Sequence, residues 1–396
     1  MINQDMYALG SHRSVIRELF EYGNQRATQI GRENVLDFSL GNPSIPAPEQ
    51  VKEELLTLLT HTDSLQLHGY TSAVGDLQTR QAIAQALNER FSAHAGAEDL
   101  FLGCGAAGEL VAVIKALSAP KAEVLAIAPY FPEYKPFVEA AGCVFRVVPA
   151  DIPDFQIDLQ ALEAMVNEHT AAVIINSPNN PSGVVYSKET LEKLAAILRK
   201  KSALYGHPVY ILADEPYREL VYDGVTVPFI PHIYPDTVVC YSYSKSLSLP
   251  GERIGYIYVP KQAADNEKLY AAIAGAARVC GHVCAPSLMQ KLIARCVGLR
   301  PDLQAYDKNR KALYEGLVAA GYQVAKPEGA FYLFVQAPGG DANAFCEKAK
   351  EKDVLVVPGD GFGCPGYFRL CYCVSYDTIM KSLPVFAQLK ETIHGI

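Results

Sequence analysis

Short apolar runs alternate with longer amphipathic stretches between about residues 50 and 260. The runs are rich in β-branched residues and have the length of strands, whereas the longer stretches place apolar side chains at helical spacing. The runs are Glu123–Ile127, Ala171–Ile175, Val209–Leu212 and Val238–Tyr241, and the helical stretches include Gly75–Phe91 and Lys188–Lys201. Buried strands separated by helices predict an α/β fold with a mainly parallel sheet sandwiched by helices.

The pattern changes after about residue 285. A long helical stretch covers Ser287–Ala320, and we expect an interruption near Arg300 and Pro301 because proline cannot continue a helix. Further apolar runs follow at Phe331–Val335, Val354–Val357 and Phe368–Val374. This mixture of helices and strands predicts a second, smaller α+β domain.

The composition fits a large protein of two domains. The chain has 396 residues, of which 49% are hydrophobic, and this length exceeds what one core usually holds. Its formal net charge of −8 argues against a nucleic-acid-binding protein, because contact with phosphate backbones needs clustered positive charge. The first residues lack the basic and apolar regions of a secretory signal, and no run reaches the ~18 apolar residues of a membrane span. We therefore expect a soluble, cytoplasmic protein without a membrane partner.

The 10 cysteines are scattered along the chain. Cys280 and Cys284 do not have a standard zinc spacing with paired ligands elsewhere. We expect the cysteines to be reduced and mostly buried, and we predict no metal site.

Polar side chains follow three of the predicted strands. They are Asn180, then Asp214 with Tyr217, then Lys245. In an open α/β sheet, ligands bind at the carboxyl ends of the strands. An amide, a carboxylate with a phenol, and an amine are therefore expected to meet at one edge of the sheet.

Lys245 lies in the most informative of these segments. A lysine amine is a useful covalent catalyst when it is deprotonated and held toward a carbonyl, most often that of pyridoxal phosphate. Ser242 and Ser244 supply hydroxyl donors beside it, and Arg253 supplies a planar guanidinium suited to a phosphate. The plain alternative is a solvated lysine in a serine-rich loop.

The segment from Tyr241 to Tyr256 resembles the cofactor-lysine motif of class I/II aminotransferases, which are pyridoxal-phosphate enzymes of the aspartate-aminotransferase type (fold type I). The resemblance rests on Ser-x-Ser-Lys and Pro-Gly-x-Arg-x-Gly-Tyr, and further matches run from about Asp37 to Ser375. It implies pyridoxal 5′-phosphate as the cofactor. It also implies a large cofactor-binding domain at 49–286, a discontinuous small domain at 1–48 plus 287–396, and a homodimer with shared active sites.

The resemblance assigns residues to the cofactor ring. Asp214 matches an aspartate that pairs with the pyridine nitrogen, and a buried carboxylate there keeps that nitrogen protonated and electron-withdrawing. Asn180 and Tyr217 match donors to the ring's phenolic oxygen, and Phe131 matches an aromatic residue that stacks on the ring face. The residues alone also fit plainer roles: Asp214 as a helix N-cap, the Asn180 segment as a turn and Phe131 as a core aromatic.

A second group is assigned to the cofactor phosphate. A glycine-rich turn before a helix offers free N–H groups and a favourable dipole to an anion, although such turns are often only structural. The residues that the resemblance places there are Gly105, Ala106, Ala107, Ser242, Ser244 and Arg253. Tyr70 matches a tyrosine that reaches the phosphate of the neighbouring subunit; its plain alternative is an aromatic residue in a surface loop.

Arg369 stands inside an apolar run and matches the family's clamp for the substrate α-carboxylate. A guanidinium binds a carboxylate through two parallel hydrogen bonds, which fixes the orientation of the amino acid. Gly41 matches a backbone contact to the same carboxylate, and Asn180 is expected beside it. The alternative for Arg369 is an internal salt bridge, because a buried charge needs a partner.

The implied reaction is a ping-pong transfer of an amino group between an L-amino acid and a 2-oxo acid, with Lys245, Asp214 and Tyr217 as catalytic residues. A C–S β-lyase or another fold-type-I reaction is the alternative. Aspartate with 2-oxoglutarate is one candidate pair, but the chain lacks the tryptophan usual at the Phe131 position in aspartate-specific members. Arg13 and Arg17 are candidates for binding a distal carboxylate and fit a solvated helix face as well.

Overall fold

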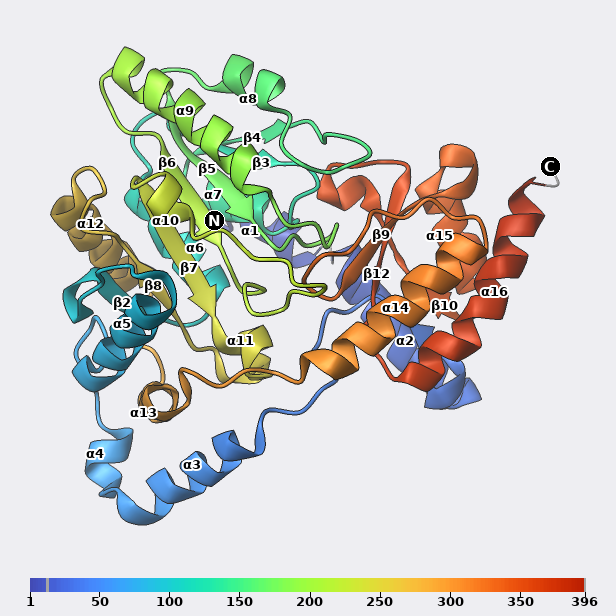
Figure 1. Ribbon diagram of the computed structural model, residues 1–396, viewed down its shortest axis with the longest axis horizontal. Helices are drawn as coiled ribbons and strands as arrows, with labels where there is room; N and C mark the ends of the chain where they lie inside the picture. The colour runs from blue at the N-terminus through green and yellow to red at the C-terminus, as the bar shows by residue number, and fades with distance from the viewer. Residues whose placement is uncertain (12–13, 395–396) are drawn as a thin grey trace.

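The computed structural model describes residues 1–11 and 14–394 of the chain. Its main sheet contains β2 (Leu100–Gly103), β3 (Glu123–Ile127), β4 (Val144–Val148), β5 (Thr170–Asn176), β6 (Tyr210–Asp214), β7 (Thr237–Ser242) and β8 (Gly255–Tyr258). The strand order is β2-β8-β7-β6-β5-β3-β4 (Figure 1). All neighbours from β7 to β4 are parallel, whereas β8 is antiparallel to β7 and β2. The predicted mainly parallel sheet is confirmed.

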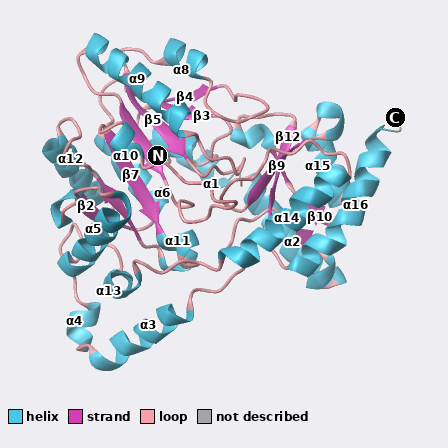
Figure 2. Cartoon of the chain, viewed as in Figure 1, coloured by secondary structure: helices cyan, strands magenta, loops and turns pink. Residues whose placement is uncertain are grey.

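Helices cover both faces of this sheet (Figure 2). They are α5 (Leu77–Phe91), α6 (Ala106–Ala116), α7 (Tyr134–Ala140), α8 (Leu159–Met165), α9 (Lys188–Tyr205), α10 (Ile230–Ile233), α11 (Tyr243–Ser246), α12 (Asn266–Val279) and α13 (Ser287–Cys296). Successive side chains of a strand point to opposite faces. In β6, Ile211 joins a core with α5, α9 and α13, whereas Leu212 joins a second core with α6 and α12. Burial on both faces explains why the strands are continuously apolar.

A smaller body contains the C-terminal elements. Its antiparallel sheet has the order β11-β12-β9, made of β9 (Tyr332–Gln336), β11 (Val357–Pro358) and β12 (Tyr367–Cys371). Its helices are α2 (Val15–Ile30), α14 (Leu303–Ala319), α15 (Ala342–Lys350) and α16 (Tyr376–His394). The N-terminal strand β1 (Leu36–Asp37) pairs with β10 (Val354–Leu355), and Phe38 is buried in the same core as Phe368 and Phe386. The domain boundaries at 48/49 and 286/287 stay a prediction.

Three further helices are α1 (Gln4–Ser11), α3 (Glu49–His61) and α4 (Ser64–His68). Figure 1 shows α3 and α4 as an arm at the lower edge of the view, between the N-terminal segment and α5. No residue of α1 is buried. Apolar side chains on the arm, including Leu56, Leu59 and Leu65, are exposed.

The run Val354–Val357, predicted as one strand, is divided in the structure, so this prediction was wrong. Its first half is β10, which pairs with the N-terminal β1, and its end belongs to β11, which pairs with β12. An apolar run carries no signal for a change of sheet in its middle. The expected interruption of the long helix is confirmed, because α13 ends at Cys296 and α14 begins at Leu303.

No helix in the described part of the chain is long and apolar enough to cross a membrane. Within residues 1–11 and 14–394, no group of three or more His, Cys, Asp or Glu is placed to hold a metal ion. Of the two arginines considered for a distal carboxylate, Arg17 is exposed on α2, and Arg13 lies outside the described residues.

Candidate active site

The carboxyl ends of β5, β6 and β7 border a cavity of about 250 Å³ between the main sheet and the smaller body. This is the edge of the sheet where ligands of open α/β folds bind. The cavity brings together most of the residues predicted from the sequence, namely Gly41, Ala106, Ala107, Phe131, Asn180, Asp214, Tyr217, Ser242, Ser244, Lys245, Arg253 and Arg369.

Lys245 projects into the cavity from the short helix α11, which begins directly after β7. The Ser242 hydroxyl caps this helix by accepting a hydrogen bond from the Ser244 N–H. The Lys245 Nζ donates to the Gly41 carbonyl at 2.7 Å. Burial lowers the pKa of the Lys245 amine to about 8, which brings its titration close to physiological pH. A solvated lysine, the plain alternative, does not describe this environment.

Asp214 ends β6 and is only 5% exposed. Its Oδ2 accepts a hydrogen bond from the Tyr134 hydroxyl at 2.5 Å and lies 3.3 Å from Asn176 Nδ2, whereas its Oδ1 has no hydrogen-bond partner. Burial raises the pKa of this carboxyl to about 7. No helix begins at Asp214, which rules out the N-cap role. An unpartnered buried carboxylate oxygen fits a cationic N–H donor such as a protonated pyridine nitrogen.

Tyr217 and Asn180 also line the cavity. The Tyr217 hydroxyl shares a hydrogen bond of 2.9 Å with the Tyr332 hydroxyl, which comes from β9 of the smaller body. The Asn180 backbone N–H donates to Asn176 Oδ1 at 2.7 Å, which fixes the turn after β5. Phe131 also lines the cavity, with its ring edge-to-face against Tyr134 at 5.7 Å between centroids.

The start of α6 and the segment after α11 form an anion cradle. Gly105, the N-cap of α6, has a φ of +81°, and a Cβ built there would lie 2.8 Å from Arg253 Nη2. The backbone conformation therefore favours glycine, and any side chain there would also displace the Arg253 guanidinium. The Ser242 and Ser244 hydroxyls are 2.7 Å apart, and Arg253 Nη1 is 3.5 Å from Ser244 Oγ. Helix N–H groups, two hydroxyls and a guanidinium are the donors that suit a phosphate.

Arg369 is a buried cation on β12, with 2% of its surface exposed. Its Nη1 donates to Asn180 Oδ1 at 3.0 Å and its Nη2 to the Ser39 carbonyl at 2.5 Å, but its Nε has no partner. No carboxylate among residues 1–11 and 14–394 lies within ion-pair distance of it, so the internal salt bridge considered from the sequence is absent there. A buried charge with neutral partners and a spare donor fits an incoming carboxylate.

Two predicted residues lie outside the lining of the cavity. Gly105 immediately precedes Ala106, which lines it. Tyr70 follows α4 and is 96% exposed, so it does not reach the cavity of its own chain. Its predicted contact with a neighbouring subunit stays a prediction.

Several residues that complete the site were not predicted from the sequence. Asn176 and Tyr134 hold Asp214, and Tyr332 holds Tyr217. Asn176 could have been found, because it is the first polar residue after a predicted strand, as Asp214 is. Tyr332 gave no comparable signal, since it lies in an apolar run of the smaller body. Ile16 and Leu40 add apolar side chains from the N-terminal segment.

Comparison with known proteins agrees with this geometry. A family model described as aminotransferase class I and II matches residues 33–383. An aspartate aminotransferase of Thermotoga maritima is 31% identical over 359 residues, covering 89% of this chain and 90% of that protein. A probable N-acetyl-LL-diaminopimelate aminotransferase of Bacillus subtilis is 28% identical, with 89% and 88% covered.

Solved structures extend the likeness to the whole fold. An aminotransferase from Eubacterium rectale superposes with a TM-score of 0.97 at 57% identity, covering 99% of both chains. The aspartate aminotransferase of Thermus thermophilus with maleate superposes with a TM-score of 0.86 at 25% identity, covering 98% of this chain and 99% of that chain. This chain therefore belongs to the class I and II aminotransferase family and is a pyridoxal-phosphate-dependent aminotransferase.

Proposed function

We propose that this enzyme moves an amino group between an L-amino acid and a 2-oxo acid in the cavity around Lys245. When bound, pyridoxal phosphate supplies an electron-poor ring that stabilises negative charge at the substrate α-carbon. Asp214 would hold the ring nitrogen, Asn180 and Tyr217 the phenolic oxygen, and Phe131 the ring face. The phosphate would be held by Gly105, Ala106, Ala107, Ser242, Ser244 and Arg253.

The observation that carries this proposal is the buried guanidinium of Arg369 with its unpartnered Nε. A substrate α-carboxylate would satisfy that donor and neutralise the charge. Asn180 Oδ1 and the Ser39 carbonyl accept hydrogen bonds from the other two nitrogens, which orients the guanidinium. A carboxylate fixed there, with Gly41 beside it, orients the α-carbon relative to Lys245.

Lys245 would act as the proton carrier. A pKa of about 8 leaves its amine partly neutral and able to take the proton from the α-carbon, and the resulting ammonium can return it. The Gly41 carbonyl, which accepts from Nζ at 2.7 Å, holds the amine on the substrate side of the cavity.

We also propose a homodimer with shared active sites. Tyr70 is almost fully exposed beside an arm whose apolar side chains are exposed, and α1 exposes Met6, Tyr7 and Leu9. Exposed apolar surface of this extent is typical of a subunit interface. A partner subunit covering the arm would bring Tyr70 toward the anion cradle of the other chain.

Several finer features belong to the same proposal. The first donor and acceptor to test are aspartate and 2-oxoglutarate, because relatives of the chain are named aspartate aminotransferases.

Free cysteines throughout the described residues support a reducing compartment, the cytoplasm. The separate cores of the main sheet and the smaller body support a division into 49–286 and 1–48 plus 287–396.

Replacing Lys245 by alanine is expected to reduce amino transfer by at least about a hundredfold, because the proton carrier is removed. The measurement is the rate of 2-oxo acid formation from a panel of amino donors at saturating cofactor. Lys261→Ala, at an exposed residue paired with Glu98, is the matched control and should keep wild-type activity. Full activity of Lys245→Ala would refute the proposed role.

Arg369→Ala is expected to raise KM for every amino donor by about tenfold or more, since a charge-assisted pair with the α-carboxylate is lost. The dissociation constant of pyridoxal phosphate should change far less, because no contact of Arg369 is assigned to the cofactor. Steady-state kinetics and cofactor titration of the same preparation give both values. An unchanged KM for all donors would count against the carboxylate clamp.

Asp214→Asn is expected to stabilise the cofactor-free protein increasingly as the pH rises. The folded-state pKa of Asp214, about 7, lies above the unfolded value near 4, so the folded wild-type protein binds more protons than the unfolded chain. Its free energy of unfolding therefore falls as the pH rises from about 4 to about 7. The free energy of unfolding of the asparagine variant, relative to that of the wild type, should therefore rise by about 3 kcal/mol from about pH 5 to about pH 8. Urea unfolding at both pH values measures it, and a constant difference would contradict the buried-carboxyl account.

A mixture of Lys245→Ala and Tyr70→Ala chains tests the shared site. Each hybrid dimer would contain one intact site, so refolding the two chains together should restore about a quarter of wild-type activity at limiting cofactor. A mixture of Lys245→Ala and Arg369→Ala is the control, because both residues serve the same chain's cavity and no intact site can form. Equal activity of the two mixtures would show that Tyr70 does not act across subunits.

A further inference from the structure

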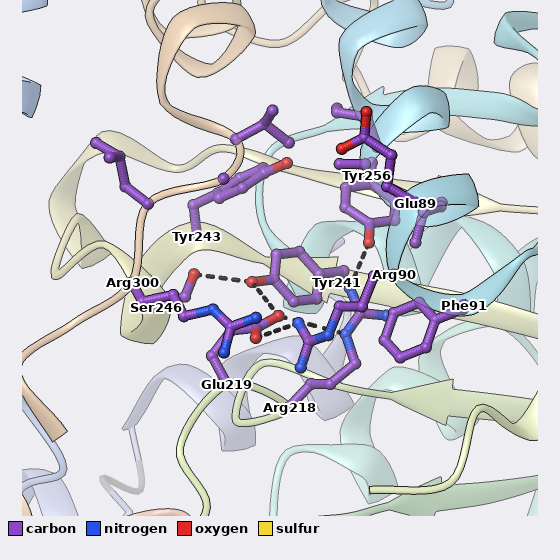
Figure 3. Close-up of a pocket in the computed structure, with 16 residues that line it drawn as sticks. Glu89, Arg90, Phe91, Arg218, Glu219, Tyr241, Tyr243, Ser246, Tyr256 and Arg300 are labelled. Atoms are coloured by element: carbon purple, nitrogen blue, oxygen red, sulfur yellow. Dashed lines mark hydrogen bonds and ion pairs between the residues drawn. The ribbon is translucent and has the colours of Figure 1, made fainter. Parts of the chain in front are cut away.

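A second cavity, of about 330 Å³, lies behind α11 (Figure 3). Its walls come from the C-terminal half of α5, the segment after β6, the strands β7 and β8, and the connection between α13 and α14. Tyr243 and Ser246, three residues apart on α11, line this cavity, whereas Ser244 and Lys245 line the active-site cavity. The two cavities therefore share one short helix as a wall.

Three arginines line the second cavity, and two of them, Arg90 and Arg218, are ion-paired. Glu219 forms ion pairs with both Arg90 and Arg218, and Arg218 also pairs with the buried Glu215 at 2.7 Å. Arg300 has its guanidinium beside Glu219 in Figure 3, and its charge interacts with that carboxylate, but no hydrogen bond or close ion pair joins Arg300 to any residue in the described part of the chain.

The other charged residue of the lining does not supply the missing partner. Figure 3 shows the carboxylate of Glu89 on the far side of the cavity, away from the arginine cluster. Among the described residues, none accepts a hydrogen bond from the Arg300 guanidinium, which can therefore donate to an anion in the cavity.

The lining also contains an unused buried donor. The Tyr243 hydroxyl has no hydrogen-bond partner although the residue is only 3% exposed. The neighbouring phenols are paired: Tyr241 donates to Ser246 Oγ at 2.9 Å, and Tyr256 accepts from Arg218 at 2.6 Å. A buried hydroxyl without a partner in a cavity wall points to a ligand that accepts its hydrogen bond.

Between these polar groups the walls are apolar. Ile83, Leu87 and Phe91 of α5 face the cavity, together with Leu299 of the α13–α14 connection. The volume falls in the range of small-molecule sites, which combine apolar walls with a few placed polar groups. We propose that this cavity is a second ligand site, which binds a small organic acid through its carboxylate on Arg300 and its apolar body on α5.

The position of α11 gives such a ligand a route to the active site. A molecule that accepts a hydrogen bond from Tyr243 and packs beside Ser246 holds one face of the helix that carries Lys245. Through this contact, occupancy of the second cavity changes the position and the proton affinity of Lys245. The ligand therefore acts as an effector of amino transfer, distinct from the substrate bound at Arg369.

Phenylacetate is a suitable probe, because it has a carboxylate and an aromatic body but no amino or oxo group that could react. Its binding is measured by calorimetry on the holoenzyme of Arg369→Ala, in which the active-site carboxylate clamp is removed. Binding should persist in this variant and weaken at least about tenfold when Arg300→Gln is added. Adding Arg295→Gln instead, at an exposed residue of α13 outside the lining, should leave it unchanged.

The effect on Lys245 is followed through the pH midpoint of the holoenzyme's visible absorption. Phenylacetate should shift this midpoint in Arg369→Ala and not in Arg369→Ala combined with Arg300→Gln. Absence of binding to Arg369→Ala, or equal affinity with and without Arg300, would overturn the second site. Binding that depends on Arg300 without any spectral shift would overturn the effector role alone. Because the calorimetry needs no turnover, these outcomes are independent of the proposed substrate.

Discussion

The structure depends on buried polar atoms that the protein itself leaves without partners. Asp214 presents an unpaired carboxylate oxygen, and Arg369 presents an unpaired guanidinium nitrogen, both in the same cavity. Burying such groups is unfavourable unless something else satisfies them. The fold holds both groups rigidly, through Tyr134 and Asn176 on one side and through Asn180 and the Ser39 carbonyl on the other. Under the proposed function, binding of cofactor and substrate would offset the stability lost at these positions.

The same contacts join the two bodies of the molecule. Arg369 comes from the smaller sheet, yet it bonds to Asn180 after β5 of the main sheet and to Ser39 of the N-terminal segment. Tyr332 of β9 likewise reaches Tyr217 after β6. The site is thus assembled from segments far apart in the sequence, and a change in the relative position of the bodies would alter the contacts of Arg369 and Tyr217. The arrangement would link the proposed binding of the substrate carboxylate to the geometry around Lys245.

Much of this could be predicted from the sequence, for identifiable physical reasons. Strands buried on both faces give continuous apolar runs, so β3, β5, β6 and β7 were recognisable, and the polar residues after them lie at one edge as the sheet topology requires. Contacts between distant segments were not predictable in the same way. The division of Val354–Val357 between two sheets depends on β1, and the role of Tyr332 depends on a tyrosine from the other body. The second cavity could not be predicted from the sequence either, because Arg300 and Tyr243 come from separate segments that line one cavity only in the folded protein.

The central claim is that the unpaired oxygen of Asp214 binds the cofactor and the unpaired nitrogen of Arg369 binds the substrate. A crystal structure of the protein with pyridoxal phosphate and an unreactive carboxylate analogue of the substrate tests it most directly. The account predicts the ring nitrogen within hydrogen-bond distance of Asp214 Oδ1 and the analogue's carboxylate on Arg369 Nε. A structure in which both atoms are satisfied by the protein's own side chains, with the ligands bound elsewhere, would contradict it.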